Sequence, residues 1–467
     1  MEPSGGLDMN YTEEQKKILK SVDRLFNAKR YQDAVDMCDY GLDVEPSLTV
    51  LYRSKAKLYQ MMGQHRKAEK YYGIAMKYFQ DYEDYFGRAV CKAEQQRYDE
   101  ATEDFKWAAQ LAPDKVAVYI QHGAAHWEMG RWKEARALFE KAVEVAPDDA
   151  NARWVLGLMK LQMNEFVDGW KLYDVRWNSP RFKSRPLETT KPKWGIGEGY
   201  KSVLVWGEQG VGDQVIYGSL LPTICHYCSK VTAMVDPRLI PLFSRSMPDI
   251  QFISNMDKVP ANEHESHIPF ASLGGCFIES QDDIREYAMH SYLEPDVNRE
   301  RELEEKLGLT NDDFVIGLSW VSSAMKIGPH KSMKLKDLAP VLAMPNCKFV
   351  NLQYGAVQQE IKESSYDIID SGIDLMKDLE GLAALSVLCD VIVSVSSSTV
   401  HIAGACGAHV KLLDSNKLWY WGNKDAQGYS DWYESVQIFN REHILADWAP
   451  QVERVVQAIE WERGHGE

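Results

Sequence analysis

Three glycines and an aspartate follow an apolar run in the segment VWGEQGVGDQV, residues 205–215. The run 202–206 predicts a buried strand, and the glycines predict a turn into a helix that extends to about residue 228. Glycine permits unusual dihedral angles and a close approach of the backbone to another group. Asp213 falls in the first turn of this helix. It either caps the helix or acts as a general base at the mouth of a site, and the local sequence leaves both interpretations open.

Hydroxyl residues mark the start of a second predicted helix. The segment DVIVSVSSSTVHIAGACGA, residues 390–408, reads as a strand that runs into a helix. Ser396, Ser397, Ser398 and Thr399 stand at the helix N-terminus, where free N–H groups and the helix dipole favour an anion. His401 follows on the helix, either as a core histidine or as part of a site.

A basic loop lies upstream of that helix. The segment KIGPHKSMKLK, residues 326–336, holds Lys326, His330 and Lys331, and two more lysines follow them. In a chain with a net charge of −16, this loop is the best candidate for a clamp on a diphosphate. The alternative is an ordinary solvated charged loop.

Alternating strands and helices must position these segments. Apolar strands separated by helices predict parallel sheets covered on both faces. The strands form two sets, before and after about residue 305, which predicts two doubly wound halves with a ligand cleft between the carboxyl ends of their strands. The predicted strands are 202–206, 230–235, 250–254, 314–320, 348–354, 366–370, 390–395 and 409–414.

The first 180 residues repeat with a period of about 34. Ala34, Ala68, Ala101 and Ala135 are spaced by 34, 33 and 34 residues, and Gly169 continues the series. Four positions after each of these residues stand Cys38, Tyr72, Phe105, Phe139 and Tyr173. Gly123 and Gly157 fall where the two helices of a pair would touch. The pattern resembles the tetratricopeptide repeat, a helix–turn–helix unit in which a small residue lets the helices approach and an aromatic residue fills the gap.

Five such units cover residues 12–182 and predict an α solenoid whose concave face holds a protein or peptide. The aromatic residues of the repeats serve either as repeat core or as a ligand cage. The segment 183–199, rich in glycine and proline, predicts a linker into the second domain.

Composition excludes several classes of protein. The acidic charge argues against binding to nucleic acid, which requires a positive face. No apolar run approaches the length of a membrane span, and the N-terminal residues lack the pattern of a signal peptide. The eight cysteines are scattered, which suits a reducing compartment, and we expect a cytoplasmic protein. No metal-binding spacing is present, so neither a metal nor a cofactor is expected.

The segments of the second half also resemble a known family. VLVWGEQGVGDQVIY and DVIVSVSSSTVHIAGACG are similar to the two signature segments of glycosyltransferase-like domains that are fused to tetratricopeptide repeats. IGLSW and FVNLQYG follow in the expected order, and GWKLYDVRW matches the join before the linker. The second half thereby resembles the heptosyltransferase type (glycosyltransferase family 9-like) of GT-B enzymes.

This resemblance implies a metal-independent transfer of a sugar from a nucleotide-activated donor. It implies that Asp213 is the general base. It also implies a donor site that includes Gly210, Gly212, Lys326, His330, Lys331, Gln353, Ser396, Ser397, Ser398, Thr399 and His401. The sequence departs from the family in two ways. Ser396 stands where the family has an aspartate, and the loop has lysines in place of arginines, which bind phosphate in a bidentate manner.

The expected protein is therefore an α solenoid followed by an α/β GT-B fold with two doubly wound Rossmann-like halves. The halves are expected at 200–305, on the acceptor side, and at 306–465, on the nucleotide-sugar side. The expected function is glycosyl transfer to a protein acceptor held by the repeats, with all chemistry beyond residue 199. Two alternatives stay open: a glycolipid or oligosaccharide acceptor, and a non-catalytic scaffold with a relic donor domain.

Overall fold

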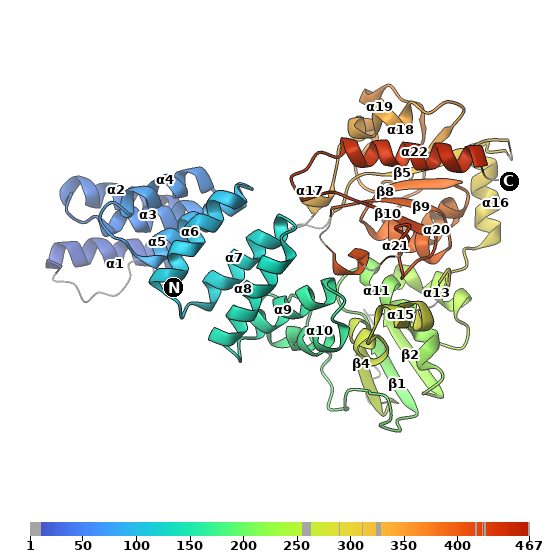
Figure 1. The fold of residues 1–467 in the computed structure, drawn as a ribbon, viewed down its shortest axis with the longest axis horizontal. Helices are drawn as coiled ribbons and strands as arrows, with labels where there is room; N and C mark the ends of the chain where they lie inside the picture. The colour runs from blue at the N-terminus through green and yellow to red at the C-terminus, as the bar shows by residue number, and fades with distance from the viewer. Residues whose placement is uncertain are drawn as a thin grey trace. The chain divides into compact units, whose positions relative to one another are not determined.

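The structure is a computed structural model that describes residues 11–254, 263–288, 290–310, 312–323, 328–415, 418–422, 424 and 426–465. The chain divides into two compact units, Met1–Leu156 and Gly157–Glu467. Figure 1 shows helices throughout the first unit and two sheets with their helices in the second.

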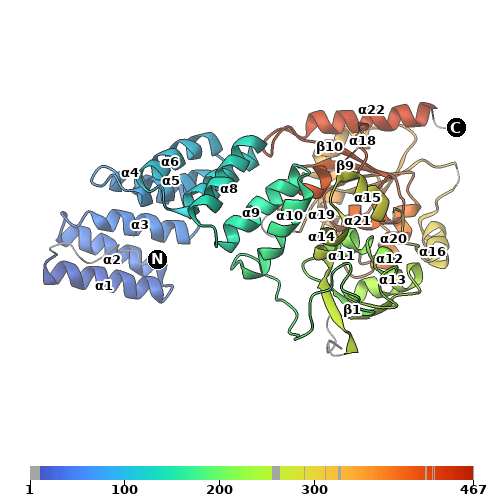
Figure 2. The ribbon, with the colours of Figure 1, turned by 60° about the horizontal axis from the view of Figure 1, so that its bottom comes forward.

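The first unit is built from helices that pack against their neighbours in the chain. Consecutive helices lie side by side, in agreement with the predicted helix–turn–helix units (Figure 2). They are α1 (Glu13–Asn27), α2 (Tyr31–Val44), α3 (Val50–Met61), α4 (His65–Ala75), α5 (Tyr82–Glu94), α6 (Tyr98–Leu111), α7 (Val116–Glu128) and α8 (Trp132–Val145), followed by α9 (Ala150–Gln162), which crosses into the second unit.

The packing of the repeats confirms the roles predicted for their small and large residues. The four repeat alanines are completely buried, as are Cys38 and Phe105. A Cβ atom on Gly123 would lie only 2.6 Å from the Phe139 ring, so this position needs glycine for the helices to touch. The small residue and the aromatic residue therefore form one contact, repeated along the solenoid.

In each of the five repeats, the turn between the two helices contains one residue in the left-handed backbone conformation. Lys29, Gly63, Gln96, Gly130 and Asn164 all have φ between 58° and 70°. Their spacing follows the repeat period, although only two of the five are glycine. The backbone conformation of the turn is thus maintained where the residue type is not.

The second helix of the fifth repeat belongs to the second unit. Helix α10 (Phe166–Tyr173) and the 3₁₀ turn η1 (Asp174–Asn178) lie beyond the unit boundary at residues 156 and 157. Trp170 of α10 is 4% exposed and contacts the rings of Tyr217 and Trp419. The repeat pattern runs to residue 182, but the compact unit ends earlier because these aromatic contacts join α10 to the α/β region.

The first sheet of the second unit has four parallel strands in the order β3-β2-β1-β4. The strands are β1 (Ser202–Trp206), β2 (Lys230–Val235), β3 (Gln251–Ser254) and β4 (Ser266–Pro269). Strand β4 was not predicted, because its four residues SHIP carry no apolar run. The helices that accompany this sheet are α11 (Val211–Gly218), α12 (Leu221–Ile224), α13 (Ile240–Ser246), α14 (Gly274–Phe277) and α15 (Gln281–Tyr287), with the 3₁₀ turns η2 (Pro237–Leu239) and η4 (Phe270–Leu273).

One expectation for this half needs correction. The helix predicted from 211 to about 228 is two helices, because α11 ends at Gly218 and Pro222 stands in the first turn of α12. The end of the predicted linker contacts the sheet. Trp194 is 3% exposed, its N–H donates to the His267 carbonyl, and the His267 N–H donates to the Pro192 carbonyl. The end of the linker therefore pairs with β4.

The second sheet has six parallel strands in the order β10-β9-β8-β5-β6-β7. The strands are β5 (Val315–Ser319), β6 (Lys348–Asn351), β7 (Ile368–Ile369), β8 (Val391–Val395), β9 (Val410–Asp414) and β10 (Val436–Asn440). Strand β10 was not predicted, because polar residues interrupt VQIFN. The remaining elements are α16 (Val297–Leu307), α17 (Gly328–Lys331), α18 (Ala339–Leu342), α19 (Gln358–Ser364), α20 (Leu379–Val387), α21 (Ser398–Ala405) and α22 (Ala449–His465), with η5 (Leu335–Leu338) and η6 (Trp419–Gly422).

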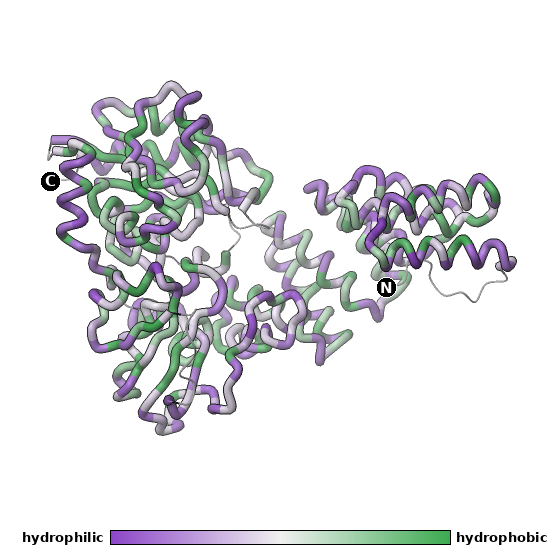
Figure 3. Tube along the Cα trace, turned by 180° about the vertical axis from the view of Figure 1, so that it is seen from behind, coloured by the Kyte–Doolittle hydropathy of each residue, from purple (hydrophilic) through white to green (hydrophobic). Residues whose placement is uncertain are grey.

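The hydropathy of the helices and strands agrees with their burial. Hydrophobic and hydrophilic stretches alternate along the helices of the first unit, as expected for helices buried on one face (Figure 3). Strands β5 and β8 are buried at every residue, which is typical of parallel strands covered on both sides. None of the described helices combines the length and the hydropathy that a membrane span requires.

Candidate functional site

The glycine-rich turn after β1 brings α11 into direct contact with α21. A Cβ atom on Gly212 would lie 2.8 Å from Cδ2 of His401, closer than real Cβ atoms approach a neighbour. Gly212 is therefore required by the contact between these two helix starts. Gly210 has no such neighbour, and it is the N-cap residue of α11. Both glycines line the cavity described below.

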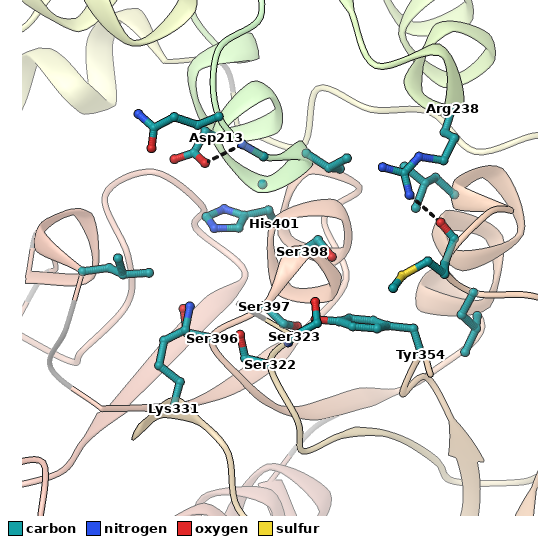
Figure 4. Close-up of a pocket in the computed structure, with 18 of the residues that line it drawn as sticks. Asp213, Arg238, Ser322, Ser323, Lys331, Tyr354, Ser396, Ser397, Ser398 and His401 are labelled. Atoms are coloured by element: carbon teal, nitrogen blue, oxygen red, sulfur yellow. Dashed lines mark hydrogen bonds between the residues drawn. The ribbon is translucent and has the colours of Figure 1, made fainter. Parts of the chain in front are cut away.

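Asp213 both caps α11 and faces the cavity. Its Oδ2 accepts the Gly210 N–H at 3.2 Å, so the capping interpretation holds (Figure 4). Burial raises the pKa of Asp213 to about 6, and the Glu208 carboxylate adds to the effect, while the Gly210 N–H and the Lys331 ammonium oppose it. A carboxylate that titrates near neutrality is suited to accept a proton.

The hydroxyl residues at the start of α21 differ in their roles. Ser396, Ser397 and Ser398 line the cavity, whereas Thr399 is completely buried and is not among the lining residues. Ser396 Oγ accepts the indole N–H of Trp421 at 2.9 Å. Ser397 Oγ is buried and has no hydrogen-bond partner among the described residues. An unpartnered hydroxyl at a helix N-terminus is what an anionic ligand would satisfy.

His401 is a buried aromatic residue of the cavity wall. Its ring stacks on Trp421 with centroids 5.0 Å apart, and Nδ1 lies 3.1 Å from the Tyr433 hydroxyl. Burial lowers the pKa of His401 to about 3, and Lys331 adds to this effect. The ring is therefore neutral, and the core interpretation and the site interpretation both apply to it.

The basic loop contributes one described cation to the cavity. Lys331 is 5% exposed and lines the cavity, and no ion pair joins it to a described residue. Burial lowers its pKa, while the charges of Asp414 and Asp213 act in the opposite direction. His330 is not among the lining residues, and its carbonyl accepts from Arg441 Nη1 at 3.5 Å. Lys326 lies outside the described residues.

Gln353 supports the site from behind. It does not line this cavity. Its Oε1 accepts the backbone N–H groups of Trp320 and Val321 at 2.8 and 2.7 Å, and its Nε2 donates to two carbonyls. The side chain therefore fixes the loop after β5, which carries the lining residues Ser322 and Ser323.

One cavity of about 580 Å³ within the second unit is lined by the predicted residues Gly210, Gly212, Asp213, Lys331, Ser396, Ser397, Ser398 and His401 (Figure 4). Its walls come from loops that follow strands of both sheets, where ligands bind in parallel α/β folds. Lining residues that were not singled out from the sequence are Gln209, Val211, Arg238, Ser322, Ser323, Tyr354, Leu375, Met376, Leu379, Leu418 and Tyr420.

Arg238 is the most informative of the residues that were not predicted. It follows β2 by three residues, pairs with Asp236, and donates to the carbonyl of Met376, a neighbouring residue of the cavity wall, at 2.6 Å. Its position just beyond the carboxyl end of a strand was the available signal. Among the described residues, no group of three His, Cys, Asp or Glu side chains is arranged to hold a metal ion.

Comparisons with known proteins identify the repeats. The tetratricopeptide repeat family model matches residues 92–158. Protein FlbA of Caulobacter vibrioides is 27% identical over 382 residues, which cover 76% of this chain and 63% of FlbA. The chain thus spans less than two thirds of the length of this relative. Because the aligned share exceeds the repeat segment, the similarity extends into the α/β region.

Solved structures are similar to about a third of the chain. MamA of Desulfovibrio magneticus RS-1 is 13% identical with a TM-score of 0.32, covering 35% of this chain and 92% of MamA. TTC0263, a repeat protein of Thermus thermophilus, is 16% identical with a TM-score of 0.31, covering 36% of this chain and 91% of its own. YrrB, described as a tetratricopeptide-repeat protein with an unusual peptide-binding site, is 15% identical with a TM-score of 0.30, covering 35% and 86%. The match to the family model shows that the chain carries tetratricopeptide repeats, and an α/β region of parallel sheets follows them.

Proposed function

We propose that the second unit is a glycosyltransferase of the GT-B type that moves a sugar from a nucleotide diphosphate donor to an acceptor hydroxyl. One observation carries the proposal. The carboxylate of Asp213, at the start of α11, and the hydroxyl-rich start of α21 line the same cavity at the carboxyl ends of two parallel sheets. Base and anion site are the two parts that such a transfer requires.

The donor diphosphate would occupy the start of α21. Ser397 and Ser398 supply hydroxyls there, and the helix supplies free N–H groups and its positive end. Lys331 adds a buried ammonium in the same cavity. Together they replace the metal ion that other enzymes use to stabilise the leaving diphosphate.

The chemical step follows from this arrangement. The acceptor oxygen attacks the anomeric carbon, the bond from that carbon to the diphosphate oxygen breaks, and Asp213 takes the acceptor proton. Because the pKa of Asp213 is about 6, the carboxylate is largely ionised at neutral pH and is still basic enough to accept the proton. Because the pKa of His401 is lowered to about 3, its ring is neutral and adds no positive charge to the donor site.

A protein or peptide is the acceptor that we propose. The tetratricopeptide repeats provide an extended surface of the kind that holds peptides, and tethering an acceptor raises its effective concentration.

A thermal-shift screen with nucleoside diphosphates and nucleotide sugars tests the donor site. A ligand at 100 times its Kd should stabilise the folded protein by about 2.7 kcal/mol. We expect one nucleoside diphosphate to give such a shift. Absence of a shift with every nucleotide at millimolar concentration would contradict the proposal.

A further inference from the structure

Arg176, in the turn that ends the last repeat, is completely buried in the second unit. Its guanidinium donates in a bidentate manner to Glu208, from Nε to Oε2 at 3.0 Å and from Nη2 to Oε1 at 2.6 Å. The rings of Tyr173 and Trp177 lie 4.4 and 4.7 Å from its Cζ. A planar guanidinium held between rings fixes the orientation of the carboxylate that it binds.

Glu208 connects this ion pair to the segment that carries Asp213. It stands two residues after β1, in the segment 207–213, called here the 207–213 turn, which consists of the turn after β1 and the first three residues of α11. Its Oε1 also accepts the Ala271 N–H at 3.2 Å, and Arg176 Nη2 also donates to Ser272 Oγ at 3.1 Å. Arg176 therefore ties together the turns that follow β1 and β4.

The next residue of the turn is held from the same side. Gln209 has a φ of 62°, a left-handed conformation that is uncommon for a residue other than glycine. Its Nε2 donates to the Tyr173 hydroxyl at 3.1 Å, and its backbone N–H donates to Ser184 Oγ at 3.1 Å. Glu208 and Gln209, the latter in a strained conformation, are thus held in place by side chains that precede the first strand in the sequence.

We propose that Arg176 and Tyr173 are positioning residues, through which the end of the last repeat holds the 207–213 turn and sets the place of Asp213. The effect on transfer rests on the proposed function, whereas the effect on the order of the turn does not. All residues proposed to take part in the chemistry still lie beyond residue 199, and Arg176 and Tyr173 act on them only by positioning.

A simpler role must be distinguished from this one, namely that Arg176 only neutralises the buried charge of Glu208. A buried ion pair is often replaceable by uncharged groups without loss of stability. The two roles therefore separate in the double variant R176M/E208Q, which removes both partners of the pair, while Asp174, the other carboxylate that Arg176 contacts, keeps its ion pair with Lys193. Neutralisation predicts full recovery in this variant, and positioning does not.

The test uses the full chain in four variants: R176M, R176M/E208Q, Y173F and, as a control, R53M. Arg53 makes a comparable buried bidentate pair with Asp84 at 2.7 and 2.6 Å, but in the first unit. Amide hydrogen exchange of the ligand-free protein reports on the turn, where the N–H groups of Gly207, Gln209 and Gly210 are hydrogen-bonded. Thermal unfolding is measured in parallel.

We expect R176M/E208Q to unfold near the wild-type temperature while peptides covering 207–213 exchange at least about tenfold faster. Y173F should accelerate exchange at Gln209, and R53M should leave the turn unchanged. If R176M does not fold, the double variant and Y173F carry the test. Wild-type protection of the turn in both of these would overturn the proposal.

Donor turnover separates this proposal from the proposed function. With a donor that the wild type hydrolyses, kcat of R176M/E208Q should fall about 10- to 100-fold, because a small misplacement of a catalytic group has an effect of that size. The KM for the donor should stay within about twofold, because the α21 start is untouched. A wild type without turnover would count against the glycosyltransferase alone, since exchange of the turn is measured without substrate.

Discussion

At the scale of single residues, the cavity combines the Asp213 carboxylate, the buried Lys331 ammonium, the Arg238 guanidinium and a cluster of hydroxyls. Asp213 and Lys331 influence each other's ionisation, and the neutral His401 ring stands between the helix starts that carry the base and the hydroxyls. The charges in the cavity are few, so each can be tested by a single substitution.

Replacing Lys331 should weaken binding of nucleoside diphosphates. Lys331→Met keeps a buried aliphatic chain but removes a charge-assisted contact, so we expect the Kd to rise about tenfold or more. The dependence of the Kd on salt should also decrease. Calorimetry at two salt concentrations measures both effects. Lys334→Met changes an exposed lysine just beyond the end of α17 and is the matched control. Equal affinities in the two variants would remove Lys331 from the site.

Asp213 should also carry a stability signature that needs no substrate. Its folded-state pKa is raised from 3.8 to about 6, so the protonated carboxyl gives stability that is present below the ordinary pKa and is lost as the pH rises through about 6. Asp213→Asn cannot ionise. It should therefore unfold at a higher temperature than the wild type at about pH 8, and show little gain at about pH 4.

The control for this titration is Asp283→Asn. Asp283 also stands at the third position of a helix and accepts the Ser280 N–H, but it lies outside the cavity. A gain that is the same at both pH values, or the same in the two variants, would show that the pKa of Asp213 is not raised.

At the scale of elements, the site depends on how closely α11 approaches α21. Gly212→Ala would place a Cβ 2.8 Å from His401, which cannot move freely because it stacks on Trp421. We expect a loss of about 1–3 kcal/mol in the free energy of unfolding, as for other overpacked cores. Denaturant unfolding measures it. Gly73→Ala, where no atom lies within 4 Å, should cost nothing. Equal stability of the two variants would contradict the close contact.

Most helices and strands could be predicted from the sequence, and those that could not have an identifiable physical reason. Strands β1, β2 and β8 follow apolar runs and start and end close to the predicted residues, and the repeat alanines are buried as expected. Strands β4 and β10 were not predicted, because each is short and polar residues alternate with its buried apolar ones.

Cavity residues could be predicted where a sequence motif runs from a strand into the following helix, as at Asp213 and Ser397. Arg238 and Tyr354 were not predicted, because only the alignment of several strand ends in space brings them to the cavity. Gln353 lies beside the site but supports its loop, and this difference depends on side-chain direction, which spacing does not contain.

At the scale of the whole molecule, the repeat pattern and the compact units do not coincide. The helix α10 and the turn η1 complete the fifth repeat in sequence, yet they belong to the second unit, which they contact through Trp170 of the helix and Arg176 of the turn. The α/β region therefore requires the end of the solenoid as part of its own core.

Two truncated proteins test this division. A fragment 149–467, which begins at the cap of α9, should fold and bind nucleotide as the full chain does. A fragment 184–467 lacks Trp170 and Arg176, so Glu208 is left buried without its cation, a change that typically costs about 3–5 kcal/mol. It should be unfolded or unstable by circular dichroism. Equal unfolding temperatures for the two fragments would contradict the role of α10.

The release of nucleoside diphosphate from nucleotide sugars tests the central claim most directly. Full-length wild type, Asp213→Asn and Asp283→Asn are each incubated at neutral pH with UDP-, GDP-, dTDP- and ADP-sugars, and the released nucleotide is quantified. We predict that the wild type and Asp283→Asn release nucleoside diphosphate from one of these donors. Asp213→Asn should bind the same donor but release nucleoside diphosphate from it at least about 100-fold more slowly. Release at the wild-type rate by Asp213→Asn, or no release from any donor by the wild type, would contradict the account.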